Sequence, residues 1–154
     1  MILRRATAAD AAILARLNAH VQGWHAAQYP ETFFAVPDPE GLVGYYEGRL
    51  AEPGCTVFLA GDPPEGYALC SLQAREASVF SPAIRRLLVE QIAVAPDARR
   101  RGVGRALMQA ARDLAVELKV DEIVLDTWEA NHAAHGFFRA EGFSPVRMLF
   151  RRKP

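Results

Sequence analysis

Residues 89–107 read Val-Glu-Gln-Ile-Ala-Val-Ala-Pro-Asp-Ala-Arg-Arg-Arg-Gly-Val-Gly-Arg-Ala-Leu. The apolar run 87–94 predicts a buried strand, and Pro96 ends it because proline cannot donate a hydrogen bond to a strand ladder. Beyond the two glycines, apolar residues recur at helical spacing through residues 103–118. The stretch therefore predicts a strand, a cationic turn and a helix, in that order.

The charge of this turn is unusual for the start of a helix. Its four arginines are Arg99, Arg100, Arg101 and Arg105. A helix N-terminus carries about half a positive elementary charge, so cations are disfavoured there unless an anion is present. Free N–H groups and glycines that allow close approach favour a phosphate or pyrophosphate group. The alternative is a solvated basic turn beside acidic neighbours.

Two common phosphate-binding motifs do not fit the sequence. A P-loop is excluded because no G-x-x-x-x-G-K-[ST] occurs. Gly102 and Gly104 begin a dinucleotide fingerprint, but Leu107 stands where its third glycine belongs. The preceding strand also follows an antiparallel hairpin rather than opening a βαβ unit.

The rest of the chain alternates strands with helices. We expect strands at residues 2–5, 56–60, 67–72, 122–127 and 146–150, with turn residues 61–66 closing a hairpin. Thr7 and Asp10 fit a capping box for a helix with an apolar face at Leu14, Leu17 and Val21. Residues 25–49 predict a loop and a second short helix, and residues 131–141 a helix that Gly142 ends. The predicted fold class is α+β, a mixed and mainly antiparallel sheet flanked by helices.

Length and composition predict one domain over residues 1–154. The chain is 51% apolar, which suffices for a core without metal or disulfide. Eighteen basic residues balance eighteen acidic ones, so we expect neither nucleic acid nor a membrane as partner. Cys55 and Cys70 form no C-x-x-C pair, which favours free thiols and a cytoplasmic location. The histidines lack the acid or thiol spacing of a metal site, so no metal is expected.

Two blocks of the sequence resemble the GNAT family of N-acetyltransferases. Residues 99–104, Arg-Arg-Arg-Gly-Val-Gly, match the family signature Q/R-x-x-G-x-G/A. Residues 125–143 resemble the second block, a strand followed by N-x-x-A-x-x-F-Y-x-x-x-G-F. Both blocks occur in the family's order and on matching elements, and the resemblance covers essentially the whole chain.

The resemblance implies a fold with two splayed parallel strands and acetyl-CoA bound between them. Its pyrophosphate would lie on the turn, held by Arg99, Arg100, Arg101, Gly102, Val103, Gly104 and Arg105. Backbone groups of Ile92, Ala93 and Val94 would pair with the pantetheine arm. Asn131 would bind the cofactor from the far side, although it is also a good helix N-cap.

The implied activity is acetyl transfer from acetyl-CoA to a primary amine by direct attack in a ternary complex. Glu90 is the candidate base, because it stands near the position of the family's catalytic carboxylate. Strand alternation predicts that Glu90 shares a face with Ile92 and Val94. The competing interpretation is a salt bridge between Glu90 and Arg85 or Arg86.

One position departs from the family pattern. The family tyrosine that protonates or stabilises the departing thiolate falls at Phe138, which also belongs to the implied cofactor site. Phenylalanine cannot donate a proton, and His135 on the same helix is a candidate substitute. Since thiolate is a good leaving group, this loss predicts slower transfer rather than none.

The acceptor amine would meet residues from the first helices and from the splayed strands. Candidates are His25, Tyr29, Phe33, Tyr46, Trp128 and Glu129, although core packing is the simpler role for each aromatic. The acceptor is a small molecule or a peptide, and a homodimer is compatible with the family. The alternative function is a catalytically weak acyl-CoA-binding sensor or interaction module.

Overall fold

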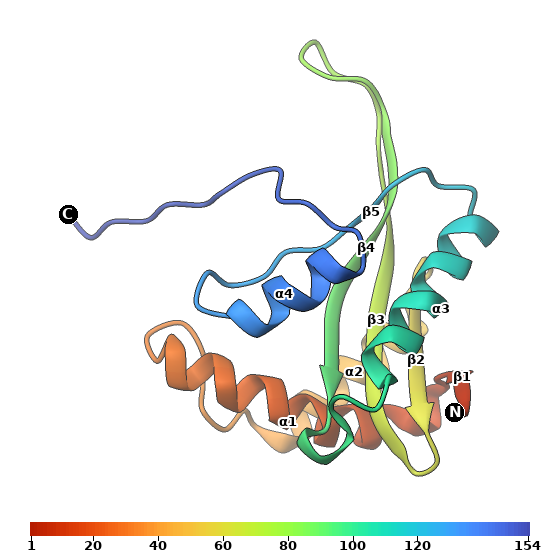
Figure 1. The fold of residues 1–154 in the computed structure, drawn as a ribbon, viewed down its shortest axis with the longest axis vertical. Coiled ribbons are helices and arrows are strands. Elements are labelled where there is room, and N and C mark those ends of the chain that lie inside the picture. Colours follow the sequence, from red (N-terminus) through yellow and green to blue (C-terminus); the bar gives the residue numbers. More distant parts are fainter.

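Five strands form one sheet in the order β1-β2-β3-β4-β5 (Figure 1). The computed structural model describes residues 1–154, with strands β1 (Leu3–Arg5), β2 (Cys55–Gly61), β3 (Pro64–Arg75), β4 (Ile84–Val94) and β5 (Ile123–Val124). The helices are α1 (Ala11–Gln28), α2 (Pro39–Ala51), α3 (Val103–Glu117) and α4 (His132–Ala140), with short 3-10 turns η1 (Ala8–Asp10) and η2 (Pro96–Ala98). Neighbouring strands are antiparallel except β4 and β5, which are parallel. The predicted fold class is confirmed.

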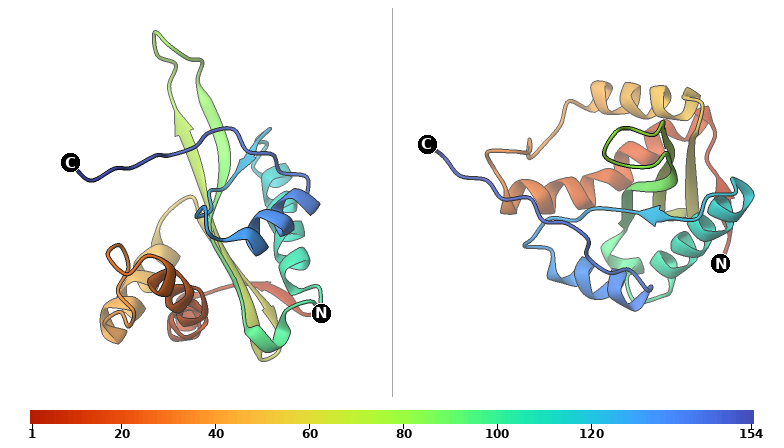
Figure 2. Two further views of the ribbon diagram at one scale, coloured as in Figure 1. Left: turned by 60° about the vertical axis from the view of Figure 1, so that its left-hand side comes forward. Right: turned by 90° about the horizontal axis from the view of Figure 1, so that it is seen from above.

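Helices cover both faces of the sheet, with α1 and α2 on one side and α3 and α4 on the other (Figure 2). Alternation along β2 produces these two layers. Val57 and Leu59 face α1 and α2, whereas Phe58 and Ala60 belong to the cluster that packs against α3. Since both faces are buried, the strands are apolar on both sides.

The predicted capping residue at the N-terminus, Asp10, also forms an ion pair. Its carboxylate accepts a hydrogen bond from the Thr7 N–H at 2.8 Å. Arg4 on β1 donates two more, at 2.7 and 2.8 Å. The Arg4 guanidinium holds the pKa of the Asp10 carboxyl well below its ordinary value.

We expect Asp10→Asn to lower the free energy of unfolding at pH 7 by about 1–3 kcal/mol, because it weakens charge-assisted hydrogen bonds of a buried group. As the pH falls, the unfolded chain binds a proton at Asp10 before the folded chain does. The contribution of Asp10 is therefore complete above about pH 5 and is lost as the pH drops further. Urea unfolding between pH 3 and 7 should give a flatter acid limb for Asp10→Asn than for the exposed control Asp121→Asn. Parallel acid limbs in the two variants would contradict this role.

A β-bulge interrupts the pairing of β3 with β4. Leu69 pairs with Gln91 and Cys70 with Val89, so Glu90 is the unpaired extra residue. Ile92 and Val94 pack against the α3 layer, whereas the Glu90 side chain reaches Arg49 of α2 on the opposite face. The prediction that alternation places Glu90 on one face with Ile92 and Val94 is wrong, because the bulge shifts the alternation by one residue.

The parallel strands β4 and β5 separate soon after they meet. Their register contains only Leu87 with Ile123 and Leu88 with Val124. Beyond Leu88, β4 continues to Val94 without a partner on its β5 side. The predicted strand 122–127 is shorter in the structure because residues 125–127 have diverged from β4.

Two further predictions about secondary structure, the loop that begins at residue 25 and the strand at residues 146–150, are wrong. Helix α1 continues to Gln28, so His25 lies in its last turn and not in a loop. The predicted strand 146–150 does not form: residues 144–154 are extended and exposed, and none of their backbone groups is hydrogen-bonded. No strand lies at hydrogen-bonding distance, so the alternating pattern has nothing to pair with.

Cys55 and Cys70 are free thiols, and burial raises the pKa of Cys70 to about 12. None of the four helices combines the length and apolar character that a membrane span requires.

Candidate active site

The turn before α3 presents a row of free backbone N–H groups. Arg100 and Gly102 both adopt left-handed conformations, with φ of 64° and 85°. None of the N–H groups of residues 100–105 donates to an acceptor in the chain. Successive free N–H groups in a turn at a helix start form a concave site suited to an anion.

Gly104 leaves this turn accessible. A Cβ atom placed on Gly104 would lie 3.2 Å from Cζ of Phe137, on α4. A side chain here would therefore require the Phe137 ring to shift by a few tenths of an ångström. Glycine avoids this close contact.

The four arginines differ in their partners. Arg101 pairs with Glu65 at 2.9 Å, and Arg105 approaches Glu141 at 3.5 Å. Arg99 and Arg100 are exposed and form no ion pair in the chain. Acidic neighbours therefore account for two of the four arginines. Arg99, Arg100 and the free N–H groups remain available to bind an anion.

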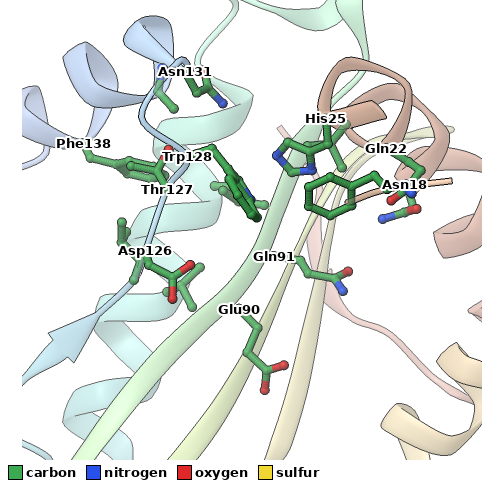
Figure 3. A pocket seen from close by; sticks show the side chains of 16 residues that line it. Asn18, Gln22, His25, Glu90, Gln91, Asp126, Thr127, Trp128, Asn131 and Phe138 are labelled. Atoms are coloured by element: carbon green, nitrogen blue, oxygen red, sulfur yellow. Dashed lines mark hydrogen bonds between the residues drawn. The ribbon is translucent and has the colours of Figure 1, made fainter. Parts of the chain in front are cut away.

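A cavity of about 280 Å³ opens where β4 and β5 separate. Figure 3 shows its construction: Asn18, Gln22 and His25 come from α1, and Glu90 and Gln91 from β4. The opposite wall comes from the segment after β5 and from α4, with Asp126, Thr127, Trp128, Asn131 and Phe138 labelled. We call residues 99–105, with their free N–H groups, the anion turn. The unpaired edge of β4 lies between this anion turn and the cavity, which is lined by both halves of the chain.

Aromatic rings line one end of the cavity. His25 stacks on Phe33 with ring centroids 4.9 Å apart, and Phe33 meets Trp128 edge-on at 5.1 Å. Tyr29 packs behind Trp128 at 4.6 Å, and its hydroxyl accepts the Ala130 N–H. Burial lowers the pKa of His25, so its imidazole is neutral at pH 7.

Glu90 forms a two-pronged ion pair with Arg49 of α2. The two guanidinium nitrogens lie 2.5 and 3.1 Å from the two carboxylate oxygens. Both side chains are about one-fifth exposed. The expected alternative partners are wrong: Arg86 approaches Glu122, and Arg85 donates to the Leu118 carbonyl. Glu90 therefore combines a place in the cavity wall with a fixed cationic partner.

A buried tyrosine pair lies behind the cavity. The hydroxyls of Tyr46 and Tyr67 lie 2.7 and 2.8 Å from Oε1 of Gln91. Asn18 donates to the Tyr67 hydroxyl at 3.1 Å. Burial raises the pKa of Tyr67 to about 12, so this hydroxyl stays protonated. The network holds Asn18 and Gln91 at the cavity surface, while Tyr46 is a core residue rather than a lining one.

The remaining predicted site residues occupy distinct places. Asn131 lines the cavity and also caps α4, accepting the Ala134 N–H at 3.1 Å. Phe138 lies in both the core and the cavity wall. One ring nitrogen of His135 is already bonded to the Trp128 carbonyl, and Glu129 is exposed outside the lining.

Several residues of the site were not found from the sequence. Arg49, Asn18, Gln91 and Asp126 reach the cavity or Glu90 only through the tertiary structure. None belongs to a motif, and Arg49 lies 41 residues from Glu90. Nowhere in the chain do three or more His, Cys, Asp or Glu side chains gather as a metal site.

Comparison with known proteins shows to which family this chain belongs. The sequence profile of the Acetyltransferase (GNAT) family matches residues 12–143. The chain belongs to the GNAT family. Members of this family use acetyl-CoA, and the anion turn and the separated strands β4 and β5 all lie within the matched residues.

Individual relatives agree with this assignment. YhfO of Bacillus subtilis (strain 168), named as an uncharacterized N-acetyltransferase, is 26% identical over 143 residues, covering 93% of this chain and 89% of YhfO. A tetramutant of the BH1408 protein from Bacillus halodurans superposes with a TM-score of 0.91 at 21% identity, covering all of both chains. The aminoglycoside N-acetyltransferase AAC(6')-Iy in complex with CoA gives 0.77 at 20% identity, covering 99% and 93%. At these identities the two solved structures support the GNAT fold alone.

Proposed function

We propose that this GNAT protein transfers the acetyl group of acetyl-CoA to the primary amine of a small molecule or peptide, by direct attack in a ternary complex. The observation that carries the proposal is the unpaired edge of β4, which runs from the free N–H groups of the anion turn to the cavity. One ligand could bind its phosphates at the turn and present an acyl group at the cavity.

The residues of the turn fit a pyrophosphate. The free N–H groups of residues 100–105 would donate to its oxygens, and Arg99 and Arg100 would contribute charge. Ile92, Ala93 and Val94 would offer backbone groups to the pantetheine arm along the unpaired edge. Asn131 would keep its amide nitrogen for the ligand, since its oxygen caps α4.

We infer that Glu90 accepts the proton of the attacking amine, directly or through a water. Bound acetyl-CoA supplies a thioester, which a neutral amine attacks more readily than an ammonium ion does. Arg49 holds the Glu90 side chain in a fixed orientation through two hydrogen bonds. Glu90 would thus act as the base while Arg49 positions it.

The acceptor amine would enter along the aromatic end of the cavity. His25 and Trp128 would contact its carbon skeleton, with Tyr29 supporting Trp128 from behind. Asp126 lines the cavity without an ion-pair partner and suits a cationic group of the acceptor. Glu129 would contribute only long-range attraction from outside the lining.

We expect Phe138→Tyr to raise kcat for acetyl transfer by roughly 3- to 10-fold, because it returns a proton donor for the departing thiolate. Phe138 points toward the cavity from α4 (Figure 3). Its burial leaves limited room, so acetyl-CoA affinity and thermal stability are measured alongside steady-state rates. Phe143→Tyr adds the same hydroxyl outside the cavity and is the control. Equal or lower kcat in well-folded Phe138→Tyr would contradict the assignment.

A second candidate function is an acyl-CoA-binding module with little turnover. Phe138 in the place of the family tyrosine favours it. The two functions are separated by release of CoA thiol during incubation with acetyl-CoA and a panel of amines, with mass spectrometry of the products. Acetylated product that depends on the protein supports the transferase, whereas tight acetyl-CoA binding without product from any amine supports the module.

A further inference from the structure

The lining of the cavity carries negative charge and no positive charge. Of its sixteen residues only Glu90 and Asp126 are charged, and no lysine or arginine is among them. The two hydrogen bonds from Arg49 balance the charge of Glu90. Asp126 forms neither an ion pair nor a hydrogen bond in the chain. One carboxylate in the cavity wall is therefore left without a partner.

Asp126 and Trp128 form one wall of the cavity. Both lie in the segment that follows β5, and their side chains extend into the space between this segment and β4 (Figure 3). Glu90 and Gln91 lie on the opposite side of that space. A carboxylate attracts a cation, and the face of an indole ring does so as well. The wall is therefore suited to an organic cation.

The α1 wall of the cavity presents hydrogen-bond acceptors. The Tyr67 hydroxyl donates to Gln91, so Asn18 donates to that hydroxyl through Nδ2, at 3.1 Å. Asn18 is only 7% exposed and lines the cavity, and its Oδ1 accepts no hydrogen bond in the chain. Gln22 likewise donates Nε2 to the Phe34 carbonyl at 2.8 Å, which leaves its Oε1 free. A buried polar atom normally has a partner, so the free Asn18 oxygen indicates a ligand that carries N–H groups.

A carboxylate on the acceptor molecule would find few partners in this cavity. The imidazole of His25 is neutral because burial lowers its pKa, and Nε2 of Gln91 already donates to the Tyr45 hydroxyl at 3.2 Å. Arg151 of the C-terminal segment lies over Tyr29, 5.8 Å from the ring centroid, and is outside the lining. Like charges placed close together are unfavourable, so Asp126 itself would repel an anionic group. The cavity therefore disfavours amines that carry a carboxylate, such as free amino acids.

The unpartnered carboxylate of Asp126 suits a cation that does not react. Attack on a thioester requires a neutral amine. A free carboxylate beside the reacting nitrogen would stabilise its ammonium form, because an opposite charge favours the charged state. Asp126 is therefore more useful as the partner of a second cationic group, while the reacting amine lies near Glu90. The cavity volume of about 280 Å³ is near the lower end of the roughly 300–1,000 Å³ of small-ligand sites, which favours a short acceptor.

We propose that the acceptor is a short aliphatic diamine or polyamine, an inference that rests on the acetyl transfer proposed above. Its second ammonium group binds at Asp126 and Trp128, and one of its N–H groups donates to Oδ1 of Asn18. The free amine lies near Glu90 and forms a bond to the acetyl carbon as the carbon–sulfur bond breaks. Its proton passes to Glu90 and CoA leaves as the thiolate, so the products are the monoacetylated diamine and CoA.

Three amines of equal chain length test this selectivity: 1,4-diaminobutane, butylamine and 4-aminobutanoate, compared at fixed pH and ionic strength. We expect kcat/KM to be about 10-fold or more higher for the diamine than for butylamine, and about 10-fold or more lower for 4-aminobutanoate, the size of one charge-assisted hydrogen bond. Asp126→Asn should reduce the diamine preference to less than about 3-fold and change kcat/KM for butylamine by less than about 2-fold. Asp126 is exposed and unpartnered, so this variant is expected to fold like wild type. Asp121→Asn, at an exposed carboxylate outside the lining, is the control and should keep the wild-type preference.

Calorimetric titration of the protein–CoA complex with the same three compounds measures the cation site without turnover. Tighter binding of the diamine than of butylamine, lost in Asp126→Asn, supports the proposal. Acetylation of amines without a preference for the diamine, or a preference that survives in Asp126→Asn, would overturn it while the transferase function stands. If no amine is acetylated, the proposed function fails. Diamine binding to the CoA complex that depends on Asp126 would then still support the cation site, and absence of that binding would overturn it.

Discussion

Gly104→Glu is expected to reduce acetyl-CoA affinity by about 100-fold or more. Gly104 is one of the residues whose N–H groups are free, and a Cβ atom there would lie 3.2 Å from Cζ of Phe137, so the variant adds both bulk and a negative charge at the anion turn. The new carboxylate would compete with phosphate oxygens for the same donors. Losing two charge-assisted hydrogen bonds, at roughly 1.5–3 kcal/mol each, accounts for a change of this size.

Calorimetric titration at fixed ionic strength measures this effect. Wild type and variant are titrated with acetyl-CoA, CoA, NADH and ATP. Gly48→Glu introduces the same side chain on α2, at an exposed position with nothing within 4 Å, and should bind like wild type. Acetyl-CoA binding that survives in Gly104→Glu would remove the turn from the site. Equal affinity of wild type for ATP and NADH would indicate a general phosphate site instead.

Glu90→Gln is expected to lower kcat by about 100- to 1,000-fold, the usual cost of losing a general base. Glutamine keeps the shape of the side chain but cannot accept the amine proton. The same change also leaves Arg49 without its carboxylate, and both side chains are largely buried. Loss of activity in this variant alone would therefore not separate a base from a structural ion pair.

The double variant Glu90→Gln/Arg49→Gln separates the two roles. It removes both charges together, so a purely structural pair would recover stability and much of the rate. For a base, the double variant stays as slow as Glu90→Gln, while Arg49→Gln alone retains more activity than either. Stopped-flow acetyl transfer and urea unfolding of all four proteins complete the cycle. Full recovery of kcat in the double variant would exclude Glu90 as the base.

Much of the fold was predictable because its signals are local. Helix α3 follows from apolar spacing, and the ends of β4 and α4 follow from Pro96, Asn131 and Gly142. Each of these features depends on residues within a turn or two of one another. The tail was wrongly assigned for the complementary reason: a strand needs a neighbour, and alternation along one segment does not supply it.

The sequence by itself determined the family, the order of the elements and the anion turn. Those properties depend on contiguous residues, since free N–H groups and left-handed glycine arise where a helix begins. Only the tertiary structure decided which face Glu90 occupies, that Arg49 holds it, and which side chains meet in the cavity. A bulge is a mismatch between two strands, and a cavity wall joins residues far apart in the chain, so neither is contained in one local pattern.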